Sequence, residues 1–297
     1  MRYLYYPGCS LEGTALEYGV ATRAVMEALD AEVKEIENWT CCGASAAESK
    51  SGLLSLVLPA ISLARAEEMN LGADVLAPCS ACYLNLKKVE IKTRKEPSLL
   101  KTINTVLKEE NLSYRATIKV RHLLDVLVND MGPEKIKSKI RHPLKGLKIA
   151  PYYGCQCLRP YSVFDDPEEP NSMEPLLKAA GADIFSWNMG PKCCGAALLT
   201  TKREDGLKLV ASILKAAKGA DAIATVCPMC QMNLEAFQDI ISTRLKQNLR
   251  ISVVYLPQLL GTAMGIDAKK LRIDLNLAVA KDLSDKLKMR SFVGQSM

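Results

Sequence analysis

Ten cysteines of this chain fall into two sets that have the same internal order. Each set has a single cysteine, then a Cys-Cys pair followed by Gly-Ala, and then a Cys-x-x-Cys motif. The first set is Cys9, Cys41, Cys42, Cys79 and Cys82, and the second is Cys155, Cys193, Cys194, Cys227 and Cys230. The second set follows the first after about 150 residues, which indicates an internal duplication. Thiolates grouped in this way bind metal ions or iron–sulfur clusters, or exchange with disulfides.

Residues around the cysteines repeat in the same register. Tyr5-Tyr6-Pro7-Gly8-Cys9 corresponds to Tyr152-Tyr153-Gly154-Cys155, and Asn85-Leu86 corresponds to Asn233-Leu234. The chain has two tryptophans, Trp39 and Trp187, and each lies just ahead of a Cys-Cys pair. The duplication therefore extends beyond the thiols to the segments that position them.

The cysteine content argues against structural disulfides. The 11 cysteines are an odd number, so complete internal pairing is excluded. The first residues lack the apolar core and cleavage site of a secretory signal, and we expect a cytoplasmic protein with reduced thiols. The two histidines, His122 and His142, leave little scope for mixed Cys/His zinc sites or haem ligation.

Several chemistries remain open for the thiols. A closed zinc site needs four ligands, whereas each half offers five, so zinc is possible in one motif but does not explain both. A thioredoxin-like dithiol would explain each Cys-x-x-Cys but neither Cys-Cys pair. Iron–sulfur clusters account for all ten and are the favoured interpretation. Cys157 lies outside the pattern and is more typical of a core thiol than of an alternative ligand. His122 could donate a proton, but a packed core histidine is favoured.

The elements that must position these cysteines alternate between strand and helix. Short segments rich in β-formers predict strands at 2–6, 33–39, 75–78 and 118–121, and again at 148–153, 183–187, 222–226 and 252–256. Thr14 and Glu17 predict a capping box that opens a helix to Leu29, and 53–69 predicts a helix that stops near Gly72. The pattern predicts an α/β fold of two pseudo-symmetric, Rossmann-like halves, each a small, mainly parallel sheet flanked by helices.

We expect four segments along the chain: a first domain at 1–132, a linker at 133–146, a second domain at 147–265 and a helical extension at 266–297. The basic residues are densest near the linker, but the net charge is only +6. This charge is typical of a solvated surface and does not indicate nucleic-acid binding. No apolar run approaches the eighteen or so residues of a membrane span.

The parallel sheets predict where the thiols meet. Ligand sites in such sheets lie at the carboxyl ends of the strands, where loops lead into helix N-termini. The cysteines of each half follow predicted strands, and Cys82 falls one turn into a helix. We therefore expect five thiols at one edge of each sheet, where backbone N–H groups favour thiolates. Gly43 and Gly195 are expected to let the backbone approach a bulky cluster.

The motif and its duplication resemble the cysteine-rich CCG domain family over nearly the whole chain. The opening YYPGCSLEGTALEY and the segment Arg121-His122-Leu123-Leu124-Asp125 look most like the B subunit of heterodisulfide reductase. The resemblance implies a non-cubane [4Fe-4S] cluster in each motif, with the ten cysteines named above as ligands and catalytic groups. It further implies a shared cavity in which the coenzyme M–coenzyme B disulfide of methanogenesis is reduced to two thiols. The electrons would come from a flavin-containing A subunit, through a ferredoxin-like C subunit.

Two other functions stay open. The chain could relay electrons in a hydroxy-acid or succinate/fumarate oxidoreductase without touching the substrate, or it could be a zinc-stabilised assembly protein without turnover. No GxGxxG turn or P-loop follows a predicted strand, so binding of a nucleotide, nicotinamide or flavin by this chain is unsupported.

Overall fold

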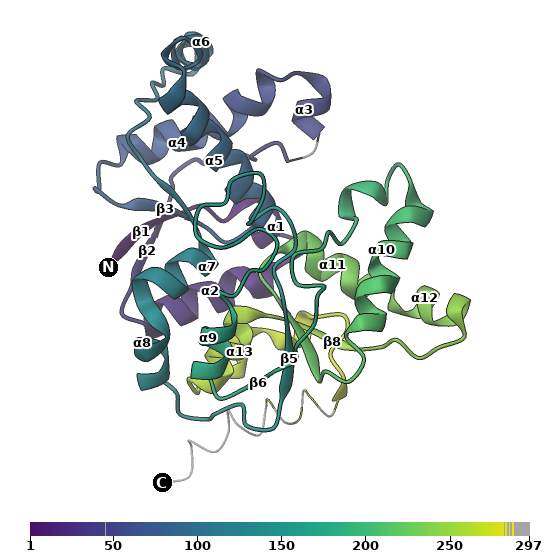
Figure 1. Cartoon of the computed structure of the whole chain (residues 1–297). Coiled ribbons are helices and arrows are strands. Elements are labelled where there is room, and N and C mark those ends of the chain that lie inside the picture. Colours follow the sequence, from purple (N-terminus) through teal and green to yellow (C-terminus); the bar gives the residue numbers. More distant parts are fainter. Residues whose placement is uncertain (45, 282, 284, 286, 288–297) are drawn as a thin grey trace.

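Two four-stranded parallel sheets form the framework of the chain (Figure 1). The computed structural model describes residues 1–44, 46–281, 283, 285 and 287. The first sheet has the order β2-β1-β3-β4 and the second the order β6-β5-β7-β8. The strands are β1 (Arg2–Tyr5), β2 (Glu32–Glu35), β3 (Asp74–Ala77), β4 (Val120–His122), β5 (Lys148–Tyr152), β6 (Asp183–Ile184), β7 (Ala222–Thr225) and β8 (Ser252–Tyr255). The predicted α/β fold with two pseudo-symmetric halves is confirmed, because each half repeats the same strand order.

Helices connect the strands of each sheet. The first half contains α1 (Gly8–Leu11), α2 (Leu16–Ala28), α3 (Ala46–Lys50), α4 (Leu54–Glu68), α5 (Ser80–Lys95), α6 (Pro97–Leu107), α7 (Leu123–Asp125), a π-helix (Val126–Met131) and α8 (Gly132–Ser138). The second contains α9 (Glu174–Ala179), a 3₁₀ turn (Ala196–Leu198), α10 (Arg203–Ala216), α11 (Pro228–Ala236), α12 (Gln238–Leu245), α13 (Leu256–Ala263) and α14 (Ala268–Leu271). Short 3₁₀ turns also occur at Lys108–Glu110 and Ile273–Leu275.

One predicted helix start differs from the structure, whereas the predicted end of the helix at 53–69 agrees with it. The helix α2 follows Ala15, which makes no side-chain cap, so the capping box at Thr14 is wrong. Glu17 is instead buried in the first turn, where α2 packs against α13 and α14. At the end of α4, Asn70 adopts the left-handed conformation (φ +47°) just after the cap residue Met69. The helix therefore stops before Gly72, because asparagine tolerates this backbone conformation.

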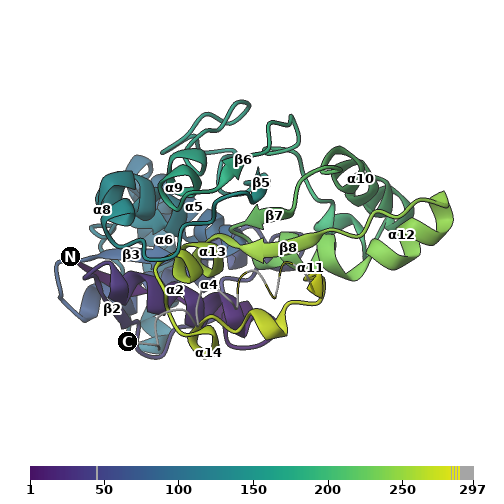
Figure 2. The same ribbon diagram turned by 90° about the horizontal axis from the view of Figure 1, so that it is seen from below.

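The two halves share one core. Figures 1 and 2 show α2 of the first half beside α13 of the second, and these helices are in contact. The rings of Tyr18 and Tyr255 stack there at 4.2 Å with an interplanar angle of 3°. Both rings are buried in a cluster that contains residues of both sheets. The stack buries large apolar surfaces and fixes the distance between the halves.

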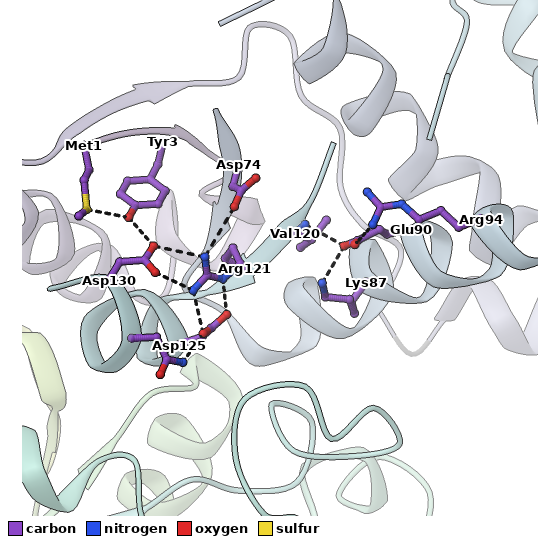
Figure 3. Close-up of polar contacts among 11 residues, drawn as sticks. Met1, Tyr3, Asp74, Lys87, Glu90, Arg94, Val120, Arg121, Asp125 and Asp130 are labelled. Atoms are coloured by element: carbon purple, nitrogen blue, oxygen red, sulfur yellow. Dashed lines mark hydrogen bonds and ion pairs between the residues drawn. The ribbon is translucent and has the colours of Figure 1, made fainter. Parts of the chain in front are cut away.

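Charged side chains attach β4 to its neighbours (Figure 3). Arg121 pairs with Asp125 and Asp130, and the Tyr3 hydroxyl donates to Asp130 at 2.6 Å. On α5, the buried carboxylate of Glu90 accepts from the backbone N–H of Val120 at 2.8 Å. The bond between Glu90 and Val120 holds α5, the helix that carries Cys82, against the sheet.

The proposed division into four segments stays a prediction. The segment 133–146 holds most of α8, which packs against α9. The expected extension at 266–297 begins with α14, and residues 288–297 lie outside the described residues. Over the ranges that the structure describes, no helix combines the length and the apolarity needed to cross a membrane.

Candidate functional site

The cysteines of the first half lie along one edge of the first sheet. Cys9 lies on α1, directly after β1, and the Cys41-Cys42 pair lies in the loop between β2 and α3. Cys79 is the N-cap of α5, and Cys82 is the third residue of that helix. The Sγ atoms of Cys9 and Cys41 are 3.9 Å apart, and those of Cys42 and Cys82 are 3.6 Å apart. The thiols therefore extend from exposed Cys9 and Cys41 to the other three, which are buried.

The second half repeats this arrangement. Cys155 follows β5, and Cys193 and Cys194 lie in the loop between β6 and the turn at Ala196–Leu198. Cys227 caps α11, and Cys230 is its third residue. The thiols of Cys155 and Cys193, and those of Cys194 and Cys230, lie close enough to shift each other's pKa. Cys193 is exposed and Cys155 half-buried, so this group also reaches from solvent to the interior.

The two groups meet at their Cys-x-x-Cys motifs. The thiols of Cys79 and Cys227 lie close enough to shift each other's pKa, and both are buried. The Ser80 hydroxyl donates to the carbonyl oxygen of Val226 at 3.2 Å, across the same junction. A cavity of about 60 Å³ lies beside this contact, lined by the second cysteine group and by Ser80. All ten predicted site cysteines thus belong to two groups that touch at one point.

A Tyr–Trp pair supports each Cys-Cys loop. The Tyr6 hydroxyl donates to the carbonyl oxygen of Thr40 at 2.6 Å, and the Tyr152 hydroxyl donates to that of Lys192 at 2.7 Å. Each carbonyl belongs to the residue before a Cys-Cys pair. Trp39 packs edge-on against Tyr6, and Trp187 is tilted against Tyr152. These contacts match Tyr6 with Tyr152 and explain why both tryptophans precede the pairs.

An asparagine holds each loop from the opposite side. The Asn85 side chain on α5 donates to the carbonyl oxygen of Cys42 at 3.4 Å. Asn233 on α11 donates to the carbonyl oxygen of Cys194 at 3.0 Å. The asparagine of each repeat therefore fastens the second cysteine of the pair to the helix that carries the Cys-x-x-Cys motif.

The glycines that make room beside the thiols are Gly8 and Gly154. Both have φ of +69°, and a Cβ on them would lie 2.6 Å from the Cys82 Sγ and 2.9 Å from the Cys230 Sγ. The expectation that Gly43 and Gly195 are glycines in order to let the backbone approach a cluster is wrong. A Cβ on Gly43 would meet the side chains of α3 and α4 instead of a cysteine, so this glycine permits a left-handed turn and close helix packing.

Hydrogen bonds favour thiolate in each group. Bonds from the Cys41 and Cys82 thiols hold the pKa of Cys42 well below its usual range. Bonds from Cys155 and Cys194 lower the pKa of Cys193 in the same way, and the Arg159 guanidinium adds to this effect. The backbone N–H of Gly195 also points to the Cys193 Sγ at 3.3 Å. Each group therefore stabilises one thiol as thiolate, the form that binds metals, while the pKa of a neighbouring thiol, Cys41 or Cys155, is raised.

Cys157 is set apart from the ligating pattern. Its side chain is buried, and its thiol donates to the carbonyl oxygen of Tyr153 at 3.2 Å. Burial raises the pKa of Cys157 to about 12. The thiol therefore stays protonated, as the interpretation of a core residue requires.

His122 is a packed core histidine. Its Nδ1 accepts from the backbone N–H of Leu124 at 3.2 Å, and its Nε2 lies 3.2 Å from the Ser80 hydroxyl. The ring stacks on Phe164 and meets Tyr83 edge-on. Burial lowers the pKa of His122 to about 4, so the ring is neutral at pH 7. These contacts favour the structural role over proton donation.

Sequence reasoning missed several residues at this edge. The sequence showed only that certain residues recur in both halves, and it did not show what they do. These residues are Tyr6, Tyr152, Gly8 and Gly154. Their shared register was the signal, because a repeated residue next to a repeated cysteine indicates a shared task. Ser80 gave no such signal, since its contact with the second half joins residues far apart in the sequence.

Comparison with known proteins agrees with this architecture. The model of a family described as "CCG: Cysteine-rich domain" matches residues 3–87 and 149–235. A Wolinella succinogenes protein named 8-methylmenaquinol:fumarate reductase membrane anchor subunit is 36% identical over 286 residues, which cover 95% of this chain and 99% of the relative. The B subunit of the ferredoxin/F(420)H(2)-dependent CoB-CoM heterodisulfide reductase of Methanosarcina acetivorans is 28% identical, over 91% of this chain and 92% of that protein.

Two further matches extend the comparison. An Archaeoglobus profundus protein, named as similar to the B subunit of heterodisulfide reductase, is 29% identical over 91% of this chain and 93% of its own length. A crystal structure of a hypothetical protein from Helicobacter pylori aligns with a TM-score of 0.75 at 16% identity. That alignment covers 95% of this chain but 52% of the solved chain, so this chain spans about half of that protein's length. At such low identity it supports the fold alone.

Proposed function

This chain belongs to the cysteine-rich CCG domain family, and we propose that it is an iron–sulfur subunit of a multi-subunit reductase. In this proposal each half binds one non-cubane [4Fe-4S] cluster through its five cysteines, and electrons pass between the halves. Such clusters supply one-electron redox chemistry when bound. The chain contributes the thiolates, the space beside them and the contact between the two sites.

The contact between Cys79 and Cys227 carries the proposal. These thiols are the N-cap residues of α5 and α11, and both are buried. Their interaction joins two sites that otherwise belong to separate sheets. Two redox groups held this close can exchange an electron without any movement of the protein. Zinc has no redox chemistry and would make no use of such a junction.

The donor set supports iron–sulfur binding. Each group is all thiol, a soft ligand type that iron–sulfur clusters use, and Gly8 and Gly154 keep the space next to one sulfur free of a Cβ. In the part of the chain that the structure describes, no three His, Cys, Asp or Glu side chains are arranged to hold a single metal ion. Five sulfurs spread over one edge fit a larger inorganic core better than one tetrahedral ion.

A relay role in a fumarate reductase-type complex is the favoured version of this function. The Wolinella protein has the higher identity, 36% against 28% and 29%, and it aligns over almost its entire length. The chain would therefore pass electrons between its partners, and fumarate would bind elsewhere in the complex.

Heterodisulfide reduction is the second candidate. It is favoured by relatives whose names refer to the B subunit of heterodisulfide reductase and that align along nearly all of this chain. In this version the ten cysteines are also catalytic, because they would hold the two clusters that supply one electron each when the coenzyme M–coenzyme B disulfide is reduced to two thiols. The partners would then be a flavin-containing A subunit, as the source of electrons, with a ferredoxin-like C subunit.

Single-turnover oxidation separates the two candidates. The chain is purified or reconstituted anaerobically, reduced with viologen, and mixed with the coenzyme M–coenzyme B disulfide while visible absorbance and EPR follow the clusters. A relay protein keeps its electrons, whereas the complete complex is reoxidised by fumarate. Rapid reoxidation of the isolated chain with release of two thiols would instead establish the heterodisulfide reductase. Stoichiometric zinc without acid-labile sulfide would contradict both and leave an assembly protein.

A further inference from the structure

Arg159 lies between the two loops that carry the more accessible cysteines of the second half. Its backbone N–H donates to the carbonyl oxygen of Cys155 at 2.9 Å. Its Nη2 donates to the carbonyl oxygen of Pro191 at 2.6 Å, two residues before Cys193. The backbone of Arg159 is thus fixed to the Cys155 loop and its guanidinium to the Cys193 loop, and this positive charge acts on the Cys193 thiol.

The rest of the loop holds the arginine in place. The Nη1 of Arg159 donates to the carbonyl oxygen of Pro167 at 2.9 Å and pairs with Glu168 at 3.0 Å. Asp165 closes the loop by accepting from the backbone N–H groups of Asn171 and Ser172. The side chain of Arg159 is 35% exposed and that of Glu168 is 67% exposed. The carboxylate therefore offsets only part of the positive charge, since solvent screens it more strongly.

The first half has no equivalent charge at this position. Arg159 is the fourth residue after Cys155, and the fourth residue after Cys9 is Gly13. Gly13 carries no side chain, and a Cβ built on it would lie 3.3 Å from the carbonyl oxygen of Cys9. The duplication is therefore broken at a position next to the first cysteine of each group, and the break adds one cation to the second half.

We propose that Arg159 raises the reduction potential of the second-half cluster relative to that of the first. The inference rests on the proposed function, because it requires a cluster at each site. Reduction adds one electron, and hence one negative charge, to the cluster without making or breaking a covalent bond. A fixed cation nearby stabilises the reduced state more than the oxidised state, and net charge near a cluster is a known determinant of its potential.

The proposal gives electron flow a direction. An electron that enters at the first half moves downhill through the Cys79–Cys227 junction to the second half. The second half is then the acceptor end of the chain, and the partner that receives electrons is expected to dock near Cys193 and Arg159.

The test is an EPR-monitored redox titration of the cluster-loaded full chain and three variants. Arg159→Gln should shift one of the two cluster potentials in the negative direction and leave the other unchanged. Arg159→Lys keeps the charge and should restore most of the parent value. Glu168→Gln removes the counter-charge, retains every bond between Arg159 and the backbone, and should shift the same cluster in the positive direction.

A matched surface pair provides the control. Arg250 binds Asp239 at 2.8 Å on the second half, with both side chains exposed, so Arg250→Gln changes the net charge equally. This variant should leave both potentials unchanged. Parent-like potentials in both Arg159→Gln and Glu168→Gln would overturn the inference, as would equal shifts in Arg250→Gln. These results would leave the proposed function intact, whereas a parent chain that binds no cluster would overturn both.

Discussion

The thiols of Cys79 and Cys227 face each other across the junction between the two sheets, close enough to shift each other's pKa. Each is the first cysteine of a Cys-x-x-Cys motif and the N-cap of a helix. The hydroxyl of Tyr18 lies within hydrogen-bond distance of the carbonyl oxygens of the preceding residues, Pro78 (2.9 Å) and Val226 (3.1 Å). The junction is therefore built symmetrically from the two repeats, with one tyrosine between them.

The proposed cluster content is directly measurable. We expect about eight iron atoms and a similar amount of acid-labile sulfide per chain after anaerobic preparation, because two four-iron clusters are proposed. Cys41→Ala should lose the first-half cluster and keep the second. Iron and sulfide assays with EPR check this, and a value near four iron atoms together with one zinc would limit the cluster to a single motif.

Cys155 and Cys157 should behave differently although they are two residues apart. Cys157→Ala should keep both clusters, because the Cys157 thiol is protonated and bonded to the Tyr153 carbonyl. Cys155→Ala should lose the second-half cluster, because the Cys155 thiol lies beside that of Cys193, within the proposed ligand group. Iron content and visible spectra of the two variants provide the measurement, and the reverse result would reassign the first ligand of the second half.

Gly8 should be intolerant of a side chain for two separable reasons. Gly8→Ala places a residue at φ +69° and puts its Cβ 2.6 Å from the Cys82 Sγ. Gly72→Ala is the matched control, since φ is +60° there and a Cβ would have open space. The control should lose only about 1–2 kcal/mol of folding free energy, from the backbone alone. Gly8→Ala should lose more and also perturb the first-half cluster, and equal denaturation midpoints with intact spectra would contradict this.

The Tyr18 hydroxyl should stabilise the junction between the halves. Tyr18→Phe keeps the ring stack with Tyr255 but removes the donor near Pro78 and Val226, which should cost about 1–3 kcal/mol in the free energy of unfolding. Tyr5→Phe is the control, because its buried hydroxyl has no hydrogen-bond partner among the described residues. Denaturant titrations should therefore leave Tyr5→Phe at or above the parent stability, and equal losses in both variants would argue against the junction role.

His122 should make folding stability depend on pH. Its pKa is lowered to about 4 by burial, below the usual 6.5, so the unfolded chain binds the proton more tightly. The stabilising effect is complete above pH 6.5 and is lost as the pH falls toward 4, by roughly 3 kcal/mol in total. Glu235 acts in the opposite direction, because burial raises its pKa to about 7. The difference between the parent and His122→Gln at pH 7 and pH 5 isolates the histidine, and identical pH profiles would contradict its neutral state.

The sequence by itself determined the repeat and most of the framework. The spacing of ten cysteines established two equivalent halves, because a duplicated chain keeps its order regardless of how it folds. The inner strands β1, β3, β5 and β7 were predictable, since buried parallel strands are short runs of apolar residues, whereas the edge strands β2 and β6 are more exposed. The tryptophans and asparagines were visible as repeat partners, although their hydrogen bonds and ring contacts were not.

Only the tertiary structure decided how the halves meet and where they differ. The Cys79–Cys227 contact and the position of Tyr18 join segments far apart in the sequence, and no local periodicity encodes such a pairing. The capping box at Thr14 failed because tertiary packing of α2 against α13 outweighed a local capping preference. The reason given for Gly43 failed because a positive φ and a close neighbour depend on helices brought together by folding. The position of the Arg159 guanidinium likewise depends on its bond to the carbonyl oxygen of Pro191. The two loops come together only because β5 and β6 lie side by side.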